Sequence, residues 1–289
     1  MAEKLPAHDS VNQHALIEDK VATMLLEPLQ AKSVVLAAGP TVFNSSEPLR
    51  IPKYTGEFNP EWVGENELIP DAGVAEWGEL KLMPTERKSI KTITRVSNEL
   101  VRMAKQGVST VLQKKLVRNV ADKLDDALLK GDGADDTVLG ILNQPDVQTA
   151  TLDTSDPDSL LDMLAMAAAS EVTPNRWLMS GADFFALRKI KDGDGRYIMQ
   201  ANGGIDGGVA YRLFDVPVTV TNKLAPGEGA LLDMKEVAVV RDIDPQVTIL
   251  NERYAEYDQQ GIRVVTRYDL GLLHPEGVIV FGGGAEASE

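Results

Sequence analysis

The 289-residue sequence contains no cysteine and only three histidines, and both shortages restrict the chemistry that it can support. Without cysteine, disulfide bonds, thiol catalysis and cysteine-ligated metal sites are excluded. His8 and His14 are spaced wrongly for two ligands on one helix face, and we expect His274, which precedes a proline, at the surface or at a cap. The sequence has no GxSxG nucleophile elbow, no GxxxxGK[ST] phosphate loop and no GxGxxG dinucleotide motif.

Long apolar runs are also missing. No stretch of 18 apolar residues is present, so no transmembrane helix is predicted, and the N-terminus lacks the apolar region of a secretory signal. The apolar content of 43% is ordinary for a soluble globular protein, and the length suggests about two domains.

Two Asp-Gly clusters, at residues 131–136 and 192–196, resemble calcium loops in their first positions only. Neither has the glutamate at the twelfth position that a calcium hand uses. Turns explain both clusters, because aspartate and glycine favour bends and left-handed backbone. We therefore predict no metal site and no cofactor, and the sequence favours an interaction or structural protein over an enzyme.

The net charge of −15 makes a general affinity for nucleic acid through a basic face unexpected. The charge is unevenly spread between two adjacent blocks. Residues 57–79 carry seven acidic side chains and no basic one (Glu57, Glu61, Glu65, Glu67, Asp71, Glu76, Glu79). Residues 81–95 carry five basic side chains against Glu86 (Lys81, Arg87, Lys88, Lys91, Arg95). The blocks can pair within a chain or between copies, or remain two solvated faces, since an exposed pair contributes only about 0–1 kcal/mol.

Residues 107–130 have the pattern of one long amphipathic helix. Apolar residues recur at steps of three and four from Val108 to Leu128. The charged residues fall largely on the other side (Lys114, Lys115, Arg118, Asp122, Asp125, Asp126). Gly131 and Gly133 can adopt the left-handed conformation that ends helices, and a short apolar turn, Gly140 to Leu142, follows.

The first part of the chain predicts an arm and a projection. Residues 1–32 are polar with one amphipathic stretch. Residues 33–39, 48–54 and 79–97 are predicted as extended strands, with a long polar loop at 55–78 between the last two. The strands beside the loop would form a two-stranded projection, which is marginal alone in water and so implies a surface to lie on. A partner subunit is one candidate.

The second part alternates helices and strands. Asp156 and Pro157 predict a helix start, with the aspartate as the cap, and Ser180 with Asp183 predicts another. Strands are predicted over 147–152, 176–180, 209–221, 230–234, 237–241, 247–257 and 262–281, with a turn at 258–261. No internal repeat is present.

Five segments, taken in order, resemble the major capsid proteins of tailed bacteriophages with the Hong Kong 97 shell fold. They are ELKLMPTERKSIKTITRVSNELVRMA, ALLKGDGADDTVLGILNQ, NRWLMSGADFFALRKIKDGDGRYIM, FDVPVTVTNKLAPG and the closing strands from Ala230 to Phe281. Asp215 stands where glycine is more usual in the fourth segment. The resemblance covers about residues 30–281.

The resemblance implies an α+β subunit of an icosahedral shell. It would comprise an N-terminal arm (1–34), an extended β-hairpin loop (50–90), a peripheral domain with a long spine helix, an axial domain and a flexible tail (282–289). The peripheral domain would take residues 35–49, 91–135 and 245–281, and the axial domain residues 136–244.

The resemblance also implies partners. Copies of the chain would form hexamers and pentamers around packaged double-stranded DNA, without sequence specificity and without a membrane. A scaffolding protein, a portal, a maturation protease and a decoration protein are further expected partners. Assembly would occur in the host cytoplasm and the product would be the capsid of the virion.

The two charged blocks then predict contacts between subunits. The predicted residues are Glu57, Glu61, Glu65, Glu67, Lys81, Arg87, Lys88, Lys91 and Arg95. Reversing Lys88 and Lys91 to glutamate is expected to impair assembly without unfolding the subunit. Two alternatives stay open: an encapsulin-type nanocompartment, which shares the fold but encloses cargo enzymes, and an ordinary enzyme that uses the Asp-Gly loops.

Overall fold

The computed structural model describes residues 33–54, 62–66, 77–83, 89–99, 107–134, 137–191, 194–197, 211–242, 246–250 and 252–282. The described helices are α2 (Val34–Ala37), α4 (Gly107–Lys130), α5 (Asp158–Ala169) and α6 (Gly181–Leu187). The described residues also include short 3-10 turns. One, Ile141–Asn143, lies between α4 and a strand, and the others lie between strands: Met234–Glu236, Ala255–Tyr257 and Pro275–Gly277.

The described strands form four sheets. They are β1 (Thr41–Asn44), β2 (Leu49–Tyr54), β3 (Trp77–Leu82), β4 (Ile90–Ser97), β5 (Gln148–Ala150), β6 (Arg176–Ser180), β7 (Arg212–Leu213), β8 (Val216–Thr221), β9 (Gly229–Leu232), β10 (Val237–Arg241), β11 (Gln246–Leu250), β12 (Gln259–Thr266), β13 (Tyr268–Leu272) and β14 (Ile279–Phe281). The largest sheet has the order β5-β14-β9-β6-β8-β7. The others are β1-β10-β13, β11-β12-β4 and the pair β2-β3.

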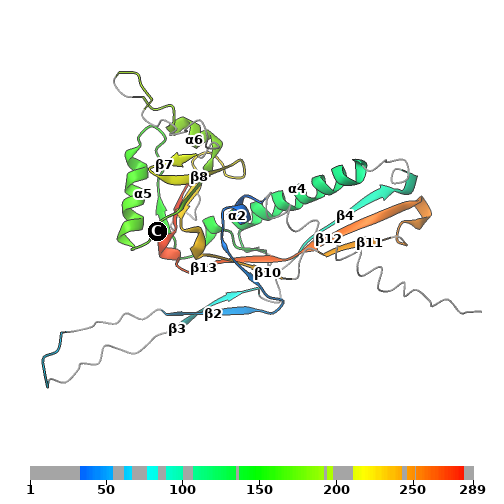
Figure 1. The fold of residues 1–289 in the computed structure, drawn as a ribbon, viewed down its shortest axis with the longest axis horizontal. Coiled ribbons are helices and arrows are strands. Elements are labelled where there is room, and N and C mark those ends of the chain that lie inside the picture. Colours follow the sequence, from blue (N-terminus) through cyan, green and yellow to red (C-terminus); the bar gives the residue numbers. More distant parts are fainter. Residues whose placement is uncertain are drawn as a thin grey trace, which may run out of the picture.

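Figure 1 shows an extended molecule with three parts. The six-stranded sheet with α5 and α6 forms one body. Helix α4 runs away from this body beside the sheet β11-β12-β4, and the pair β2-β3 projects in the opposite direction. The predicted mixture of helices and strands, and the predicted two-stranded projection, are confirmed.

The predicted long helix is confirmed with its expected bounds, Gly107–Lys130. Leu116, Val120, Leu124 and Leu128 are all buried along one side, as the spacing of apolar residues predicted. The prediction for Asp125 is wrong. We placed this residue on the charged, outer side of the helix, but its side chain is buried and the residue is only 2% exposed.

After the end of α4, the backbone at Gly131 packs closely against the backbone at Val138. An added Cβ on Gly131 would lie 2.0 Å from the carbonyl oxygen of Val138, so no larger residue fits there. Only Gly133 has the left-handed backbone that we predicted for both glycines, with φ of 69°. The side chain of Asn143 donates to the carbonyl oxygens of Lys130 and Gly131, each at 3.0 Å, and so satisfies the last turn of the helix.

We predicted a strand over residues 33–39, and this prediction is wrong. The segment contains the short helix α2. The two adjacent valines, Val34 and Val35, favour a strand on local propensity. The hydroxyl of Ser33 instead caps the helix by accepting from the backbone N–H of Leu36. The carboxylate of Asp125, distant in sequence, accepts from the backbone N–H groups of Val34 and Val35. A nonlocal contact therefore overrides the local preference.

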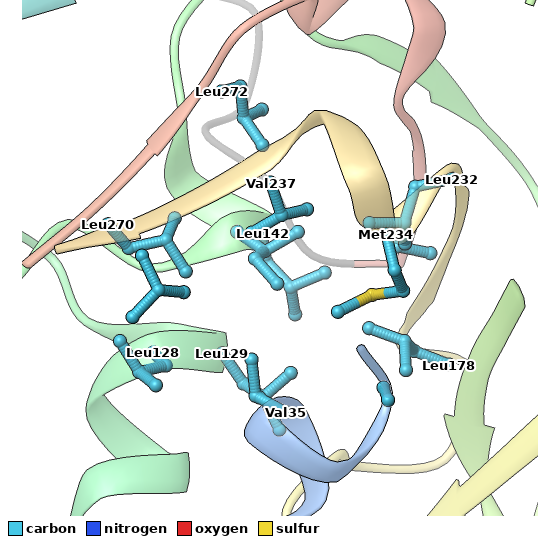
Figure 2. Close-up of a cluster of buried hydrophobic side chains, with 14 of the residues drawn as sticks. Val35, Leu128, Leu129, Leu142, Leu178, Leu232, Met234, Val237, Leu270 and Leu272 are labelled. Atoms are coloured by element: carbon cyan, nitrogen blue, oxygen red, sulfur yellow. The ribbon is translucent and has the colours of Figure 1, made fainter. Parts of the chain in front are cut away.

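In the described residues, two large buried clusters pack the helices against the sheets. The larger one joins α2 and the end of α4 to strands of two sheets; Figure 2 shows Val35, Leu128 and Leu129 facing Met234 and Leu270. The second lies between α5, α6 and the opposite face of the six-stranded sheet, and it includes Trp177 and Phe281. Because β9 and β14 contribute to both clusters, the six-stranded sheet is continuous with the packing around α4.

Other boundaries also differ from the sequence prediction. The strands predicted over 209–221 and 262–281 are each divided, and the strand predicted over 247–257 ends at Leu250. Helix α5 begins at Asp158 with Pro157 at the cap position, although the Asp156 carboxylate still accepts from the N–H of Asp158 at 2.9 Å. Strand β12 begins at Gln259, inside the predicted turn, because the chain reverses earlier and Asp258 adopts a left-handed conformation. The strand over 176–180 and the Ser180 cap of α6 are confirmed.

Candidate assembly surfaces

The projection formed by β2 and β3 has a fixed root. The two strands are antiparallel, in register from Leu49 opposite Leu82 to Tyr54 opposite Trp77. Leu82 and Met83 are each 3% exposed and pack with Ala238 and Val240. The buried carboxylate of Asp269 accepts from the N–H of Met83 at 2.7 Å. The projection therefore leaves the molecule in a direction set by buried contacts.

Two tryptophans are exposed on this projection. Trp62 is 105% exposed and Trp77 is 68% exposed. Large aromatic side chains dominate the energetics of protein interfaces when they are covered. In the described part of the chain, no element of the subunit covers Trp62. An exposed aromatic side chain of this size is typical of a surface that contacts another protein.

The acidic block of the sequence is only partly described. Glu65 is exposed, in the segment between β2 and β3. Glu79, on β3, forms an ion pair of 3.6 Å with Arg50 on β2, so one member of the block pairs within its own chain. Glu57, Glu61 and Glu67 lie outside the described residues.

The basic block divides between two distant elements. Lys81 is exposed on β3, in the projection. Lys91 and Arg95 are exposed on β4, four residues apart, and so share one face of the sheet β11-β12-β4. The structure therefore brings Lys91 and Arg95 together and sets Lys81 apart, while Arg87 and Lys88 lie outside the described residues.

The fold adds further cations to this face that the sequence pattern did not predict. Arg263 on β12 lies between Lys91 and Arg95, because it is directly opposite Ile93 on β4. Arg253 lies at the turn between β11 and β12, with its guanidinium carbon 5.7 Å from the ring centre of Tyr254. The strand register places Arg263 on this face and the turn before β12 places Arg253 near it, and no local sequence motif predicts either position.

The other candidate chemistries find no support in the described residues. They contain no group of three or more histidine, aspartate or glutamate side chains placed to hold a metal ion. The carboxylate of Asp132 accepts from the N–H of Ala134 at 3.0 Å, so the first Asp-Gly cluster is a turn, as predicted. No described helix combines the length and the apolar character needed to cross a membrane. His274 is at the surface, with Nδ1 2.7 Å from Glu236.

Curated proteins similar to this chain carry one name. The chain is 24% identical over 295 aligned positions to a protein named major capsid protein from Klebsiella oxytoca phage phiKO2, covering 93% of this chain and 68% of that protein. It is 22% identical over 273 positions to the major capsid protein of Enterobacteria phage HK97, covering 88% of this chain and 67% of that protein.

Solved structures share the fold. A structure described as the capsid of a native GTA particle aligns with a TM-score of 0.69 and 16% identity, over 86% of this chain and 89% of that chain. A protein of Mycobacterium phage Cain aligns with a TM-score of 0.62 and 18% identity, over 83% and 84% of the two chains. The predicted α+β shell fold is thereby confirmed.

A family model described as the phage capsid family matches residues 13–282, which is nearly the whole sequence. The resemblance drawn from five short segments is thereby confirmed over the full length of the fold. This chain belongs to the phage capsid family.

Proposed function

We propose that this chain is the major capsid protein of a tailed phage, which self-assembles into an icosahedral shell around a double-stranded DNA genome. The observation that carries the proposal is the projection β2-β3, which has a buried root and an exposed tryptophan end. Contact with a second copy would remove the aromatic surface of this projection from water, and the burial would stabilise the assembly. Family membership and the names of the similar curated proteins agree with this role.

The proposed division of labour follows the parts of the fold. The axial domain (136–244) would contain α5, α6 and most of the six-stranded sheet, and would gather around the symmetry axes of hexamers and pentamers. The peripheral domain (35–49, 91–135 and 245–281) would contain α4, as the spine helix, and the sheet β11-β12-β4. Strand β14 (Ile279–Phe281) returns to pair with β5 and β9, so the two domains would share a sheet rather than a flexible linker.

The role proposed here is structural and involves no catalysis. The further partners are those that a phage shell requires, namely a scaffolding protein, a portal, a maturation protease and a decoration protein. We propose that assembly takes place in the host cytoplasm and that the product is the virion capsid. The predicted acidic and basic residues, Glu65, Lys91 and Arg95 among them, are proposed to form contacts between subunits.

An encapsulin-type compartment would use the same fold around a different content. The similar curated proteins are named as phage major capsid proteins, which favours the phage shell. Expression of the chain followed by sedimentation and negative-stain microscopy tests the proposal. Large closed particles support it, while a chain that stays monomeric or forms only small oligomers, with or without scaffolding protein, contradicts it. Particles that copurify with one cargo enzyme would favour the compartment instead.

A further inference from the structure

The sheet β1-β10-β13 is covered on both of its faces. Alternate residues of its strands, such as Val239 and Leu270, pack into the larger buried cluster. Successive side chains of a strand point to opposite faces of a sheet. Ala238 and Val240, which alternate with Val239, belong instead to a separate buried cluster with Leu82 of β3. The root of the projection therefore covers the second face of this sheet.

This second face carries two directly opposite pairs of residues, Ala238 with Gly271 and Val240 with Asp269, which we call the seat. Gly271 has no side chain and Ala238 has a single methyl group, and both are buried. Small residues of this kind allow a second layer of backbone to approach closely. The seat is thus shaped to receive β3.

Gly271 determines how closely β3 approaches the seat. An added Cβ at this position would lie 2.6 Å from Cδ2 of Leu82, and 3.2 and 3.3 Å from Cδ1 and Cδ2 of Leu80. Leu82 is only 3% exposed and has buried neighbours, so the end of its side chain has little room to rotate away. A side chain at position 271 would therefore push the strand itself away from the sheet.

The chain leaves the seat through a residue with unfavourable backbone. Met83 directly follows β3 and has a φ of 56°, which few residues other than glycine adopt. Such a conformation persists only where the surrounding structure fixes it. The N–H of Met83 donates to the carboxylate of Asp269 at 2.7 Å, and its side chain is buried. Strand β3 is therefore held at its end by a hydrogen bond and along its length by close packing.

We propose that the seat determines the size of the assembled particle, and that Gly271 is its critical residue. The inference rests on the proposed function, in which the projection of each copy contacts a neighbour. The angle at which the projection leaves one copy then sets the angle between copies. In a closed shell of identical subunits, that angle is repeated at every contact and so determines the curvature.

Spin labels can measure the direction of the projection, because the chain has no cysteine of its own. The variant E79C/D162C places one label on an exposed residue of β3 and one on an exposed residue of α5. In unassembled full-length subunits, double electron–electron resonance should give a single narrow distance distribution. Adding G271A should shift or broaden this distribution. An unchanged distribution would overturn the role of Gly271.

The matched control for the labelled protein is G181A. A Cβ at Gly181 meets only a methyl group at 3.5 Å, so the distance distribution should not change. The compensating variant is G271A/L82V, which removes one methyl group from the residue that the new methyl group meets. It should restore the original distribution, because the total volume in the seat is conserved. Equal shifts in G181A and G271A would contradict the proposal.

Particle diameter tests the consequence for assembly. Under the same assembly conditions, electron microscopy should show one diameter for the unmodified chain, G181A and G271A/L82V, and a different or mixed diameter for G271A. L82V alone opens space over Gly271 and should also alter the diameter, so it provides the test if G271A does not fold.

The possible results separate this proposal from the proposed function. Particles of the original diameter from G271A, in spite of a shifted projection, would overturn the size proposal and leave the shell function intact. The same result from L82V would overturn it if G271A does not fold. If the unmodified chain forms no particles, the shell function itself fails.

Discussion

The carboxylate of Asp125 accepts a hydrogen bond of 2.6 Å from the hydroxyl of Ser33, although the two residues are 92 positions apart. The same carboxylate accepts from the backbone N–H groups of Val34 at 2.8 Å and Val35 at 3.3 Å. The last third of α4 therefore holds the first turn of α2. This places the end of the proposed N-terminal arm at a fixed point on the proposed spine helix.

Removing this carboxylate should destabilise the subunit. In D125A, the N–H groups of Val34 and Val35 lose their buried acceptor, and a bond to a charged group contributes about 1.5–3 kcal/mol. We expect the free energy of unfolding to fall by about 3 kcal/mol in urea titrations of unassembled subunits. D162N, a change at an exposed aspartate of α5, is the control and should alter it little. Equal stability of the two variants would show that the Asp125 contacts contribute nothing.

Asp125 should also make stability depend on pH with a defined sign. Burial raises the pKa of Asp125 above its ordinary 3.8, against the opposing effects of the bonds from Ser33, Val34 and Val35 and of the charge of Lys223. The folded state then holds the proton more tightly than the unfolded state. The stability that the bound proton contributes is fully present below the pKa of the unfolded state. It is lost as the pH rises through the higher pKa of Asp125 in the folded state.

The comparison that isolates this effect uses D125N, which cannot ionise. The free energy of unfolding of the unmodified protein minus that of D125N should fall as the pH rises above 3.8, the ordinary pKa of aspartate. Urea titrations of both proteins at a series of pH values measure the difference. A difference that grows with pH would mean that the hydrogen bonds to the carboxylate outweigh its burial.

Two glycines at the end of α4 should tolerate no side chain. An added Cβ would lie 2.0 Å from the Val138 carbonyl oxygen at Gly131, and 2.6 Å from the backbone nitrogen of Gly131 at Gly140. Backbone cannot move aside as a flexible side chain can. G131A and G140A should therefore each lower the free energy of unfolding by about 3 kcal/mol or more. Thermal unfolding measures this loss. The control G181A meets only a methyl group at 3.5 Å and should keep its melting temperature; an equal loss in all three would refute the packing argument.

The turn between β7 and β8 is strained and can be improved. Phe214 and Asp215 have φ values of 47° and 64°, and Leu213 pairs directly with Val216 on either side of them. A two-residue turn of this kind favours Asn-Gly, because both residues are left-handed. F214N/D215G should raise the free energy of unfolding by about 1 kcal/mol. D215A should lower the free energy of unfolding, because alanine tolerates left-handed backbone less well than aspartate. A fall in the free energy of unfolding on D215G would contradict this explanation.

The elements predicted well from sequence are those whose causes are local. The spacing of Leu116, Leu124 and Leu128 was enough to place α4, and the Ser180 cap was enough to place the start of α6. The family resemblance also rested on local segments. Helix α2 was missed because its stabilising contact comes from Asp125, which no short-range pattern connects to Val34.

The candidate contact surface was predicted in part for the same reason. Lys91 and Arg95 were found as members of a charged block, since they are neighbours in sequence. Arg263 and Arg253 were missed because they join this face only through the pairing of β12 with β4 and the fold of the turn before it. Strand register is a tertiary property, set by packing against α4 and the remaining core.

A reconstruction of the assembled particle by cryo-electron microscopy tests the central claim most directly. The account predicts a closed icosahedral shell in which the projection β2-β3 of each copy lies against a neighbouring copy, with Trp62 covered at that contact. Particles that are open or irregular under all assembly conditions would contradict the claim. So would a closed shell in which Trp62 faces solvent and the projection touches no neighbour.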